Sequence, residues 1–321
     1  MLHKRAIRAI AHTLGVLQVA RHFRRSGVRI LMYHRFPPDT TTGLQRECEH
    51  IRRHYHPLAL GELARCLREE RPWPEHAVVV TIDDGYRDFL TSGHPVFRAF
   101  DIPATLFVVS DVADGRLWLW PDIVEYTIAH SPRPSFTFAL EHGPVQTYAL
   151  GTSAERRALS SALAIQLTEV DNEWRLQALR ELQELLEVEI PQRPPEPHAP
   201  LTWNEIRALA AAGVEIGAHT KTHPILPRVA DPAAVEAEIV LSKARIEEEL
   251  GQPVRHFCFP SGQHTPAAVD AIRRAGYETA VTTERGMNAA GSPRFLLRRL
   301  GVEPSNPMEY FAELLSGVRT A

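Results

Sequence analysis

The sequence is poor in the features that mark a disulfide-bonded secreted domain, a membrane protein or a nucleic-acid-binding protein. Only three of its 321 residues are cysteine, and Cys48, Cys66 and Cys258 are too widely spaced for a CxxC pair or a disulfide framework. No stretch approaches the roughly 20 apolar residues that span a bilayer. The formal net charge of -3 provides no overall basic field for nucleic acid. A glycine-rich phosphate loop is absent as well, which argues against magnesium-dependent phosphoryl chemistry.

The composition that remains is ordinary for a globular protein. Hydrophobic residues make up 44% of the chain and charged residues 23%. A chain of this length can bury a sizeable core, as one large domain or two small ones.

Residues 1–26 carry apolar side chains at helical spacing among several arginines (Leu2, Ile7, Ile10, Leu14 and Leu17). Residues 11–13 interrupt the continuous apolar centre that a signal peptide would have. We therefore expect an amphipathic helix, either packed on the domain or lying on an anionic membrane surface. The expected location is cytoplasmic, with peripheral contact to the inner membrane as an open alternative.

Short apolar runs typical of buried strands alternate with helical patterns along most of the chain. Strands are predicted at 28–34, 77–84, 102–109, 214–219, 255–259 and 277–282, with a possible one near 296–302. This alternation indicates a parallel sheet covered by helices, either an incomplete barrel or an open sheet.

The stretch from about 112 to 200 interrupts this alternation, and we interpret it as an insertion. It contains a possible hairpin, a charged helical region at 153–188 and a proline-rich connector at 191–200. The predicted organisation is a helix at 1–26 followed by one domain at 27–321 that carries this insertion.

Polar residues gather where the predicted strands end. His34, the Asp83–Asp84 pair, His219 and the turn at 259–262 each follow a different strand. Because the carboxyl ends of parallel strands share one face of the sheet, these residues are expected to line one rim.

The rim residues suit a divalent metal. His219 and His223 are four positions apart, so on one helical turn or in a tight loop both imidazoles can face one ion. Two imidazoles and a carboxylate leave coordination positions open for water and substrate. One aspartate can then bind the metal while the other acts as a general base, although the pair could simply cap a helix.

Three motifs, TIDDG, HTKTH and FCFPSG, occur in this order with a strand before each. They resemble the first three motifs of the polysaccharide deacetylase family, also called the NodB-homology or carbohydrate esterase 4 group. The resemblance implies a metal-dependent N-deacetylase of acetylated amino-sugar polymers, built on a distorted (β/α) barrel of about seven parallel strands. It also implies a zinc ion, with cobalt or nickel as alternatives.

Carried over residue by residue, the resemblance makes Asp84, His219 and His223 the metal ligands and Asp83 the general base. Residues 260–262 would line the substrate groove. These are Pro260, Ser261 and Gly262, and the backbone N–H of Ser261 would help to hold the oxyanion.

The sequence also departs from the usual family pattern. Cys258 stands where the family has an arginine that tethers the base, the TTERGMN segment lacks the usual Asp-Trp pair, and no histidine follows His264 to act as the general acid. His34 resembles the histidine of a circularly permuted branch that includes biofilm poly-N-acetylglucosamine deacetylases, which makes it the expected acid. By the same resemblance Arg299, with Arg298 as its competitor, would orient Asp83.

Two tryptophans at the start of the insertion, Trp118 and Trp120, look exposed and could stack on sugar rings, or they could anchor the insertion to the barrel. The favoured function is removal of N-acetyl groups from amino sugars of a polysaccharide or exopolysaccharide. The alternatives are a deacylase of a lipid-linked sugar at the cytoplasmic membrane face and a non-catalytic carbohydrate-binding relative.

Overall fold

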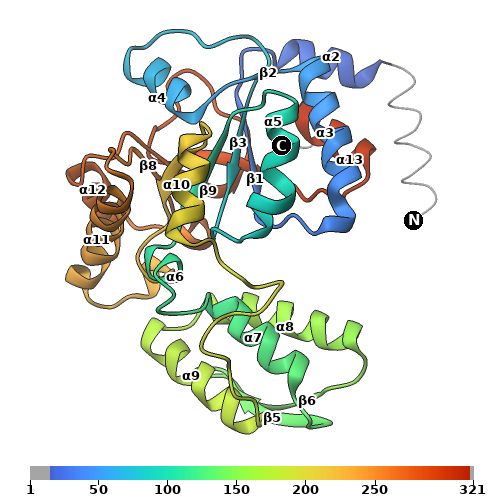
Figure 1. The fold of residues 1–321 in the computed structure, drawn as a ribbon, viewed down its shortest axis with the longest axis vertical. Coiled ribbons are helices and arrows are strands. Elements are labelled where there is room, and N and C mark those ends of the chain that lie inside the picture. Colours follow the sequence, from blue (N-terminus) through green and yellow to red (C-terminus); the bar gives the residue numbers. More distant parts are fainter. Residues whose placement is uncertain (1–14, 319–321) are drawn as a thin grey trace.

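The computed structural model describes residues 15–318, which form a closed parallel barrel with a lobe at one end (Figure 1). Around the barrel the strands are β1 (Arg29–Tyr33), β10 (Leu297–Gly301), β9 (Thr279–Arg285), β8 (His256–Cys258), β7 (Glu215–Ala218), β4 (Ala104–Val108) and β3 (Ala77–Ile82). Pairing of β3 with β1 closes the ring. The prediction of a distorted (β/α) barrel of about seven parallel strands is confirmed, and the alternative of an open sheet is wrong.

The barrel is irregular in two places. The two-residue strand β2 (His56–Pro57), which the sequence did not predict, pairs with the start of β3. The register between β9 and β10 shifts between Leu297 and Arg299. Both irregularities involve strands next to β3 or β1. β2 pairs with β3, and β10 pairs with β1.

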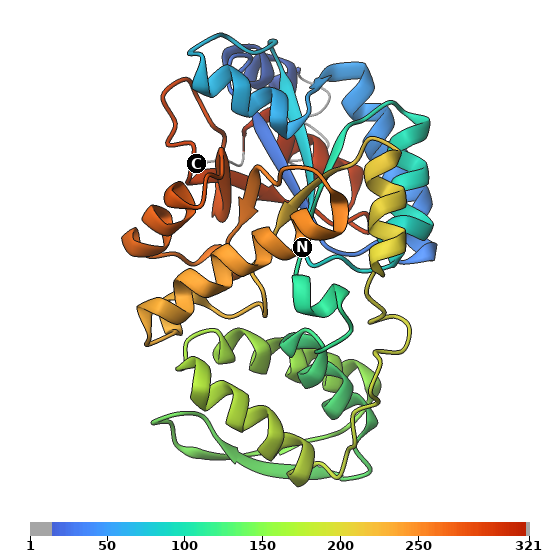
Figure 2. The same cartoon turned by 60° about the vertical axis from the view of Figure 1, so that its left-hand side comes forward.

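Helices cover the outside of the barrel (Figures 1 and 2). They are α3 (Thr41–His54), α4 (Leu60–Arg68), α5 (His94–Ala99), α10 (Trp203–Ala211), α11 (Pro232–Leu250), α12 (Pro266–Arg274) and α13 (Met308–Ser316). The short helix α2 (Val16–Phe23) packs against α13, and α6 (Ser110–Ala113) follows β4. Among residues 15–318, no helix is both long enough and apolar enough to cross a bilayer.

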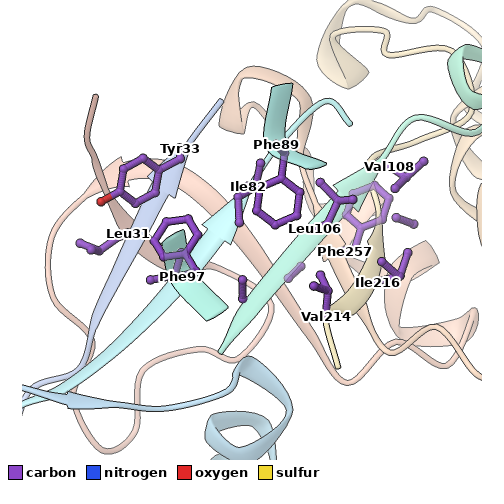
Figure 3. Close-up of a cluster of buried hydrophobic side chains, with 14 of the residues drawn as sticks. Leu31, Tyr33, Ile82, Phe89, Phe97, Leu106, Val108, Val214, Ile216 and Phe257 are labelled. Atoms are coloured by element: carbon purple, nitrogen blue, oxygen red, sulfur yellow. The ribbon is translucent and has the colours of Figure 1, made fainter. Parts of the chain in front are cut away.

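Side chains along each strand alternate between two hydrophobic clusters, as the two-residue period of a strand requires. In β3, Val78, Val80 and Ile82 belong to the cluster under the outer helices, where Figure 3 shows Ile82 beside Phe89. Ala77 and Val79 belong to the second cluster, inside the barrel. Continuing this alternation past the end of the strand turns Asp83 toward the barrel interior.

The lobe has a hydrophobic core of its own. Its elements are α7 (Trp120–His130), the antiparallel pair β5 (Ser135–Ala139) and β6 (Val145–Ala149), α8 (Ser153–Leu167) and α9 (Asn172–Leu185). Leu163, Leu167, Leu179 and Leu182 pack there with residues of α7 and β5. The predicted hairpin and helical region are therefore confirmed.

The proposed division of the chain into domains stays a prediction. Residues 1–14 of the expected N-terminal helix lie outside the described residues, and only its last part is seen as α2. The lobe lies at the end of the barrel where β3 and β4 finish, since α6 and the residues after β3 adjoin it (Figures 1 and 2).

Candidate functional site

The rim at the carboxyl ends of the strands brings together the six titratable residues that the sequence singled out. His34 follows β1, Asp83 and Asp84 follow β3, His219 and His223 follow β7, and Arg299 lies in β10. All six are connected by the polar contacts described below.

Asp83 forms a buried, bidentate ion pair with Arg299. Oδ1 accepts from Nη1 and Oδ2 from Nη2, each at 2.7 Å, and the exposed fractions of the two side chains are 3% and 0%. Burial raises the pKa of Asp83, but the guanidinium outweighs it, so the pKa lies below its ordinary value. Asp83 is thereby held as a carboxylate.

Arg299 is itself fixed by the barrel. Its Nε donates to the carbonyl of Thr282 at 2.8 Å and its Nη1 to Oγ1 of Thr81 at 3.1 Å. Arg298, the competitor, instead lies on the other face of β10 and pairs with Glu284 at the surface. The contact with Asp83 therefore belongs to Arg299.

Cys258 fills the space beside this ion pair. Its Sγ lies 3.4 Å from Oδ2 of Asp83 and 3.1 Å from Nη2 of Arg299. Burial raises the pKa of Cys258, so the group is a neutral thiol that can donate weakly to the carboxylate. A small residue here leaves room for the arginine that arrives from β10.

Asp84 reaches the same site because the chain turns sharply after β3. Its φ of 74° and the φ of 80° at Gly85 lie in the left-handed region, which aspartate tolerates better than most residues. The N–H of Gly85 donates to the carbonyl of Asp83 at 2.9 Å and closes the turn. Two consecutive carboxylates can therefore share one site instead of facing opposite sides of the sheet.

His219 and His223 both present Nε2 to the same oxygen of Asp84. The distances to Oδ1 are 3.4 and 3.5 Å. Nδ1 of His219 lies 2.8 Å from the carbonyl of Cys258, an acceptor only, so Nδ1 carries the proton and the lone pair of Nε2 faces Asp84. Ligands of a tetrahedral zinc ion lie about 3.3 Å apart, and this donor set fits such an ion.

The charges of Asp84, His219 and His223, which we call the triad, also favour a bound cation. The pKa of Asp84 lies well below its ordinary value, because the three nearby imidazoles outweigh its burial. Burial and the neighbouring His219 lower the pKa of His223 to about 3, whereas the pKa of His219 is raised despite burial. These shifts favour a positive charge beside Asp84, and a divalent ion held by the Nε2 lone pairs of the two imidazoles would supply it.

The HTKTH segment is a tight loop, the second of the two geometries expected. Thr220 and His223 have φ values of 65° and 61°. Glu238 of α11 holds the loop by accepting from the N–H groups of Lys221 and Thr222, both at 2.8 Å. Oγ1 of Thr220 accepts from the N–H of His223 at 3.0 Å. These bonds offset the backbone strain and fix both imidazoles.

His34 lies on the open side of the site. Its Nε2 is 3.7 Å from Oδ2 of Asp83, and 43% of its side chain is exposed. It is the most exposed of the six residues that form the rim, so an incoming substrate can reach it.

Residues 260–262 form a turn directly after β8. Ser261 has a φ of 52°, and its carbonyl accepts from Oγ1 of Thr283 at 3.0 Å. Gly262 is required there, because a Cβ would lie 2.2 Å from Oγ1 of Thr283. Pro260 is buried.

Trp118 and Trp120 look exposed in the sequence but are each only 6% exposed, so of the two alternatives the structure supports packing of the insertion. Nε1 of Trp118 donates to the carbonyl of Pro191 in the connector at 3.0 Å. Trp120 lies in the core of the lobe under the guanidinium of Arg175. Both rings serve the packing of the insertion, so neither offers the open face that sugar stacking needs.

A neighbouring network of buried polar residues was missed from the sequence. The hydroxyl of Tyr86 donates to both carboxylate oxygens of Asp122 at 2.9 and 3.0 Å, and Nδ1 of His198 lies 3.1 Å from Asp122. Asp122, Glu125 and His198 have donor atoms within 4.8 Å of one another, but the hydroxyl of Tyr86 already contacts both oxygens of Asp122. Tyr86 follows the aspartate pair by two residues, the only sequence signal that could have revealed it.

Comparison with known proteins gives one family match. The family described as polysaccharide deacetylase matches residues 147–280, a stretch that contains His219, His223 and the 260–262 turn. A poly-beta-1,6-N-acetyl-D-glucosamine N-deacetylase of Escherichia coli K12 is 35% identical over 81 residues. That alignment covers 25% of this chain but only 12% of the length of the relative.

Two solved structures share the fold over nearly the whole chain. The Streptococcus pyogenes deacetylase PplD in complex with acetate has a TM-score of 0.60 at 17% identity, covering 90% of this chain and 98% of its own. IcaB from Ammonifex degensii has a TM-score of 0.57 at 17% identity, covering 90% and 97%. The TM-scores show a common fold, and at 17% identity the likeness extends to the fold alone.

The triad predicts that the protein binds about one divalent ion per chain and loses it when a ligand is removed. Asp84→Ala and His219→Ala should each abolish the binding of added zinc, measured by elemental analysis after dialysis. His264→Ala, which removes an exposed histidine of the same rim, is the matched control and should keep the ion. Loss of the ion in His198→Ala but not in His219→Ala would show that it binds at the Asp122 group instead.

Proposed function

We propose that this chain belongs to the polysaccharide deacetylase family and hydrolyses N-acetyl groups of an amino-sugar polymer with the help of a divalent metal; its motifs, the family match over residues 147–280 and its fold support this. The observation that carries the proposal is the different surroundings of two adjacent carboxylates. Asp84 faces two imidazoles, while both oxygens of Asp83 are held by Arg299.

Asp84, His219 and His223 would hold the metal, most favourably zinc, with cobalt or nickel as alternatives. When bound, such an ion polarises the acetyl carbonyl and makes water more acidic. The distances of 3.4 and 3.5 Å from Nε2 of the two imidazoles to Oδ1 of Asp84, and the contact of His219 Nδ1 with the Cys258 carbonyl that turns Nε2 toward the site, support this assignment.

Asp83 would act as the general base. Arg299 keeps it ionised, and its burial beside Cys258 leaves the carboxylate little freedom to turn. It can therefore take a proton from the attacking water without reorganising. The neutral Asp83 is then flanked by the positive Arg299, which favours return of the proton.

His34 would act as the general acid on the leaving amine. The ring is close to Asp83 yet open to solvent, so it can contact a substrate nitrogen that lies over the site. The backbone N–H of Ser261 would stabilise the oxyanion from the opposite turn. Pro260 and Gly262 would shape the groove beside it.

The substrate we propose is a polymer of N-acetylglucosamine, and β-1,6-linked chains are the first to test. The support is the name of the Escherichia coli relative, which acts on poly-beta-1,6-N-acetyl-D-glucosamine. Because the alignment spans 12% of that relative, linkage and chain length are proposals for this chain.

Zinc-loaded protein should release acetate from β-1,6-linked N-acetylglucosamine oligomers, with an equal amount of free amine. Asp83→Asn should lower kcat by about 10²–10⁴-fold, the usual contribution of a general base, while zinc content stays unchanged. Release of acetate from a lipid-linked sugar but not from the oligomers would favour the deacylase alternative. If neither substrate reacts but oligomers bind equally to wild type and Asp83→Asn, the chain is a carbohydrate-binding relative.

Replacing Arg299 should shift the pH dependence of the reaction. Arg299 lowers the pKa of Asp83, so Arg299→Met raises that pKa, and the acid limb of kcat/KM moves to higher pH. Arg298→Met, which removes only a surface ion pair, should leave the limb in place. Folding is checked by circular dichroism, and an unchanged limb in folded Arg299→Met would rule out Arg299 as the group that sets this pKa.

We also propose that the N-terminal segment touches an anionic membrane. Residues 1–26 contain six lysines and arginines and no acid (Lys4, Arg5, Arg8, Arg21, Arg24 and Arg25). On α2, Val16, Val19 and Phe23 are 43%, 56% and 80% exposed. α2 comes before β1 and His34 comes after it, so the site lies at the end of the barrel opposite α2. A site far from the membrane-contacting helix favours a polymer substrate over a lipid-linked sugar.

Vesicles test this contact. The protein should sediment with phosphatidylglycerol vesicles and remain in the supernatant with phosphatidylcholine vesicles, and Phe23→Ser should weaken sedimentation. Val145→Ser, which removes an apolar side chain of the lobe that is 71% exposed, is the control. Equal sedimentation with both kinds of vesicle, or no sedimentation, would contradict an anionic-membrane contact.

A further inference from the structure

The backbone beside His34 is held by an arginine that the proposed reaction does not use. Among the described residues, the His34 ring has one ion-pair contact, the 3.7 Å approach to Asp83. A ring that is 43% exposed and so lightly held depends on its backbone for its position. The contacts of the next two residues therefore decide where the imidazole points.

Asp88 fixes this backbone from the loop that carries the two catalytic aspartates. One oxygen, Oδ2, accepts from Nε of Arg35 at 2.8 Å and from the N–H of Phe36 at 3.1 Å. Asp88 thus ties the two residues after His34 to the segment that begins at Asp83. The acid and the base are linked through four residues of chain and one carboxylate.

Arg35 extends the linkage to the connector behind the lobe. Its Nη2 donates to the carbonyl of Pro197 at 2.5 Å, and its guanidinium lies 4.1 Å from the centre of the Tyr86 ring. The charge on Asp88 outweighs the effect of burial and raises the pKa of Arg35, so the guanidinium stays charged. The side chain of Arg35, which belongs to the loop after β1, therefore contacts both the loop after β3 and the connector.

The connector is in turn paired with the β3 loop. The N–H of Arg87 donates to the carbonyl of Ala199, and the N–H of Leu201 donates to the carbonyl of Gly85, both at 2.9 Å. On the other side, the hydroxyl of Tyr86 is held by Asp122 of the lobe. Arg35 lies where these three segments meet.

We propose that Arg35, clamped by Asp88, is a positioning residue that sets the place of the His34 imidazole over the leaving amine. This inference rests on the proposed role of His34 as general acid and adds the contacts that set the position of its ring. The guanidinium is suited to the task, because its planar fork can serve Asp88 and the Pro197 carbonyl at the same time. Lysine, with a single ammonium group, could not keep both bonds in this geometry.

A pair of substrates separates positioning of the acid from general damage to the site. An amide needs its leaving amine protonated, whereas 4-nitrophenyl acetate expels a stable phenolate without an acid. Arg35→Ala and Asp88→Asn should lower kcat on N-acetylglucosamine oligomers by about 10²-fold, the cost of a misplaced catalytic group, with KM little changed. Hydrolysis of the ester should stay close to the wild-type rate, and added guanidinium should partly restore amide hydrolysis by Arg35→Ala.

The neighbouring Arg87 is the matched control. It belongs to the same loop but pairs with Glu205 at the surface, so Arg87→Ala should leave both reactions unchanged. Equal losses on amide and ester, or an Arg35→Ala variant as active as Arg87→Ala, would overturn the inference. Wild-type protein that hydrolyses the ester but no amide would instead contradict the proposed function, and with it the role of His34 that Arg35 supports.

Discussion

The buried ion pair between Asp83 and Arg299 is the interaction on which the rest of the site depends. Either charge alone inside the barrel would cost several kcal/mol, and removing one partner of such a pair typically costs about 3–5 kcal/mol. The pair spans from β3 to β10 across β1, the strand that leads to His34. It also occupies both oxygens of Asp83, so that Asp84 is left as the carboxylate that faces His219 and His223.

The period of the strands explains much of this arrangement, and for that reason much of it could be predicted. Six short runs typical of strands, with a possible seventh near 296–302, were sufficient to predict the strands, and the residues after four of them were sufficient to predict the shared rim. Asp83 faces the barrel interior because it continues the alternation of Ala77 and Val79. Arg299 comes two residues after Leu297 and therefore shares the inner face of β10 with it. The inner face of this strand can be identified only once β10 is known to pair with β9.

Other features depend on contacts between distant segments and could not be predicted from local patterns. The left-handed turn at Asp84 has no sequence signal beyond the following glycine. Trp118 looks exposed in the sequence, yet the connector 73 residues later accepts a hydrogen bond from its ring and helps to bury it. Arg35 and Asp88 read as ordinary surface charges until the β1 and β3 loops are brought together.

The central claim is that the two adjacent aspartates have different roles, Asp84 as a metal ligand and Asp83 as the general base. Crystals of the zinc-loaded protein test this claim most directly. An anomalous difference map at the zinc absorption edge locates the ion without reference to any mechanism. The account predicts one strong peak bound by Asp84, His219 and His223, with Asp83 still paired to Arg299 and outside the coordination shell. A peak bound by Asp83, or one located at Asp122 and His198 with the triad empty, would contradict it.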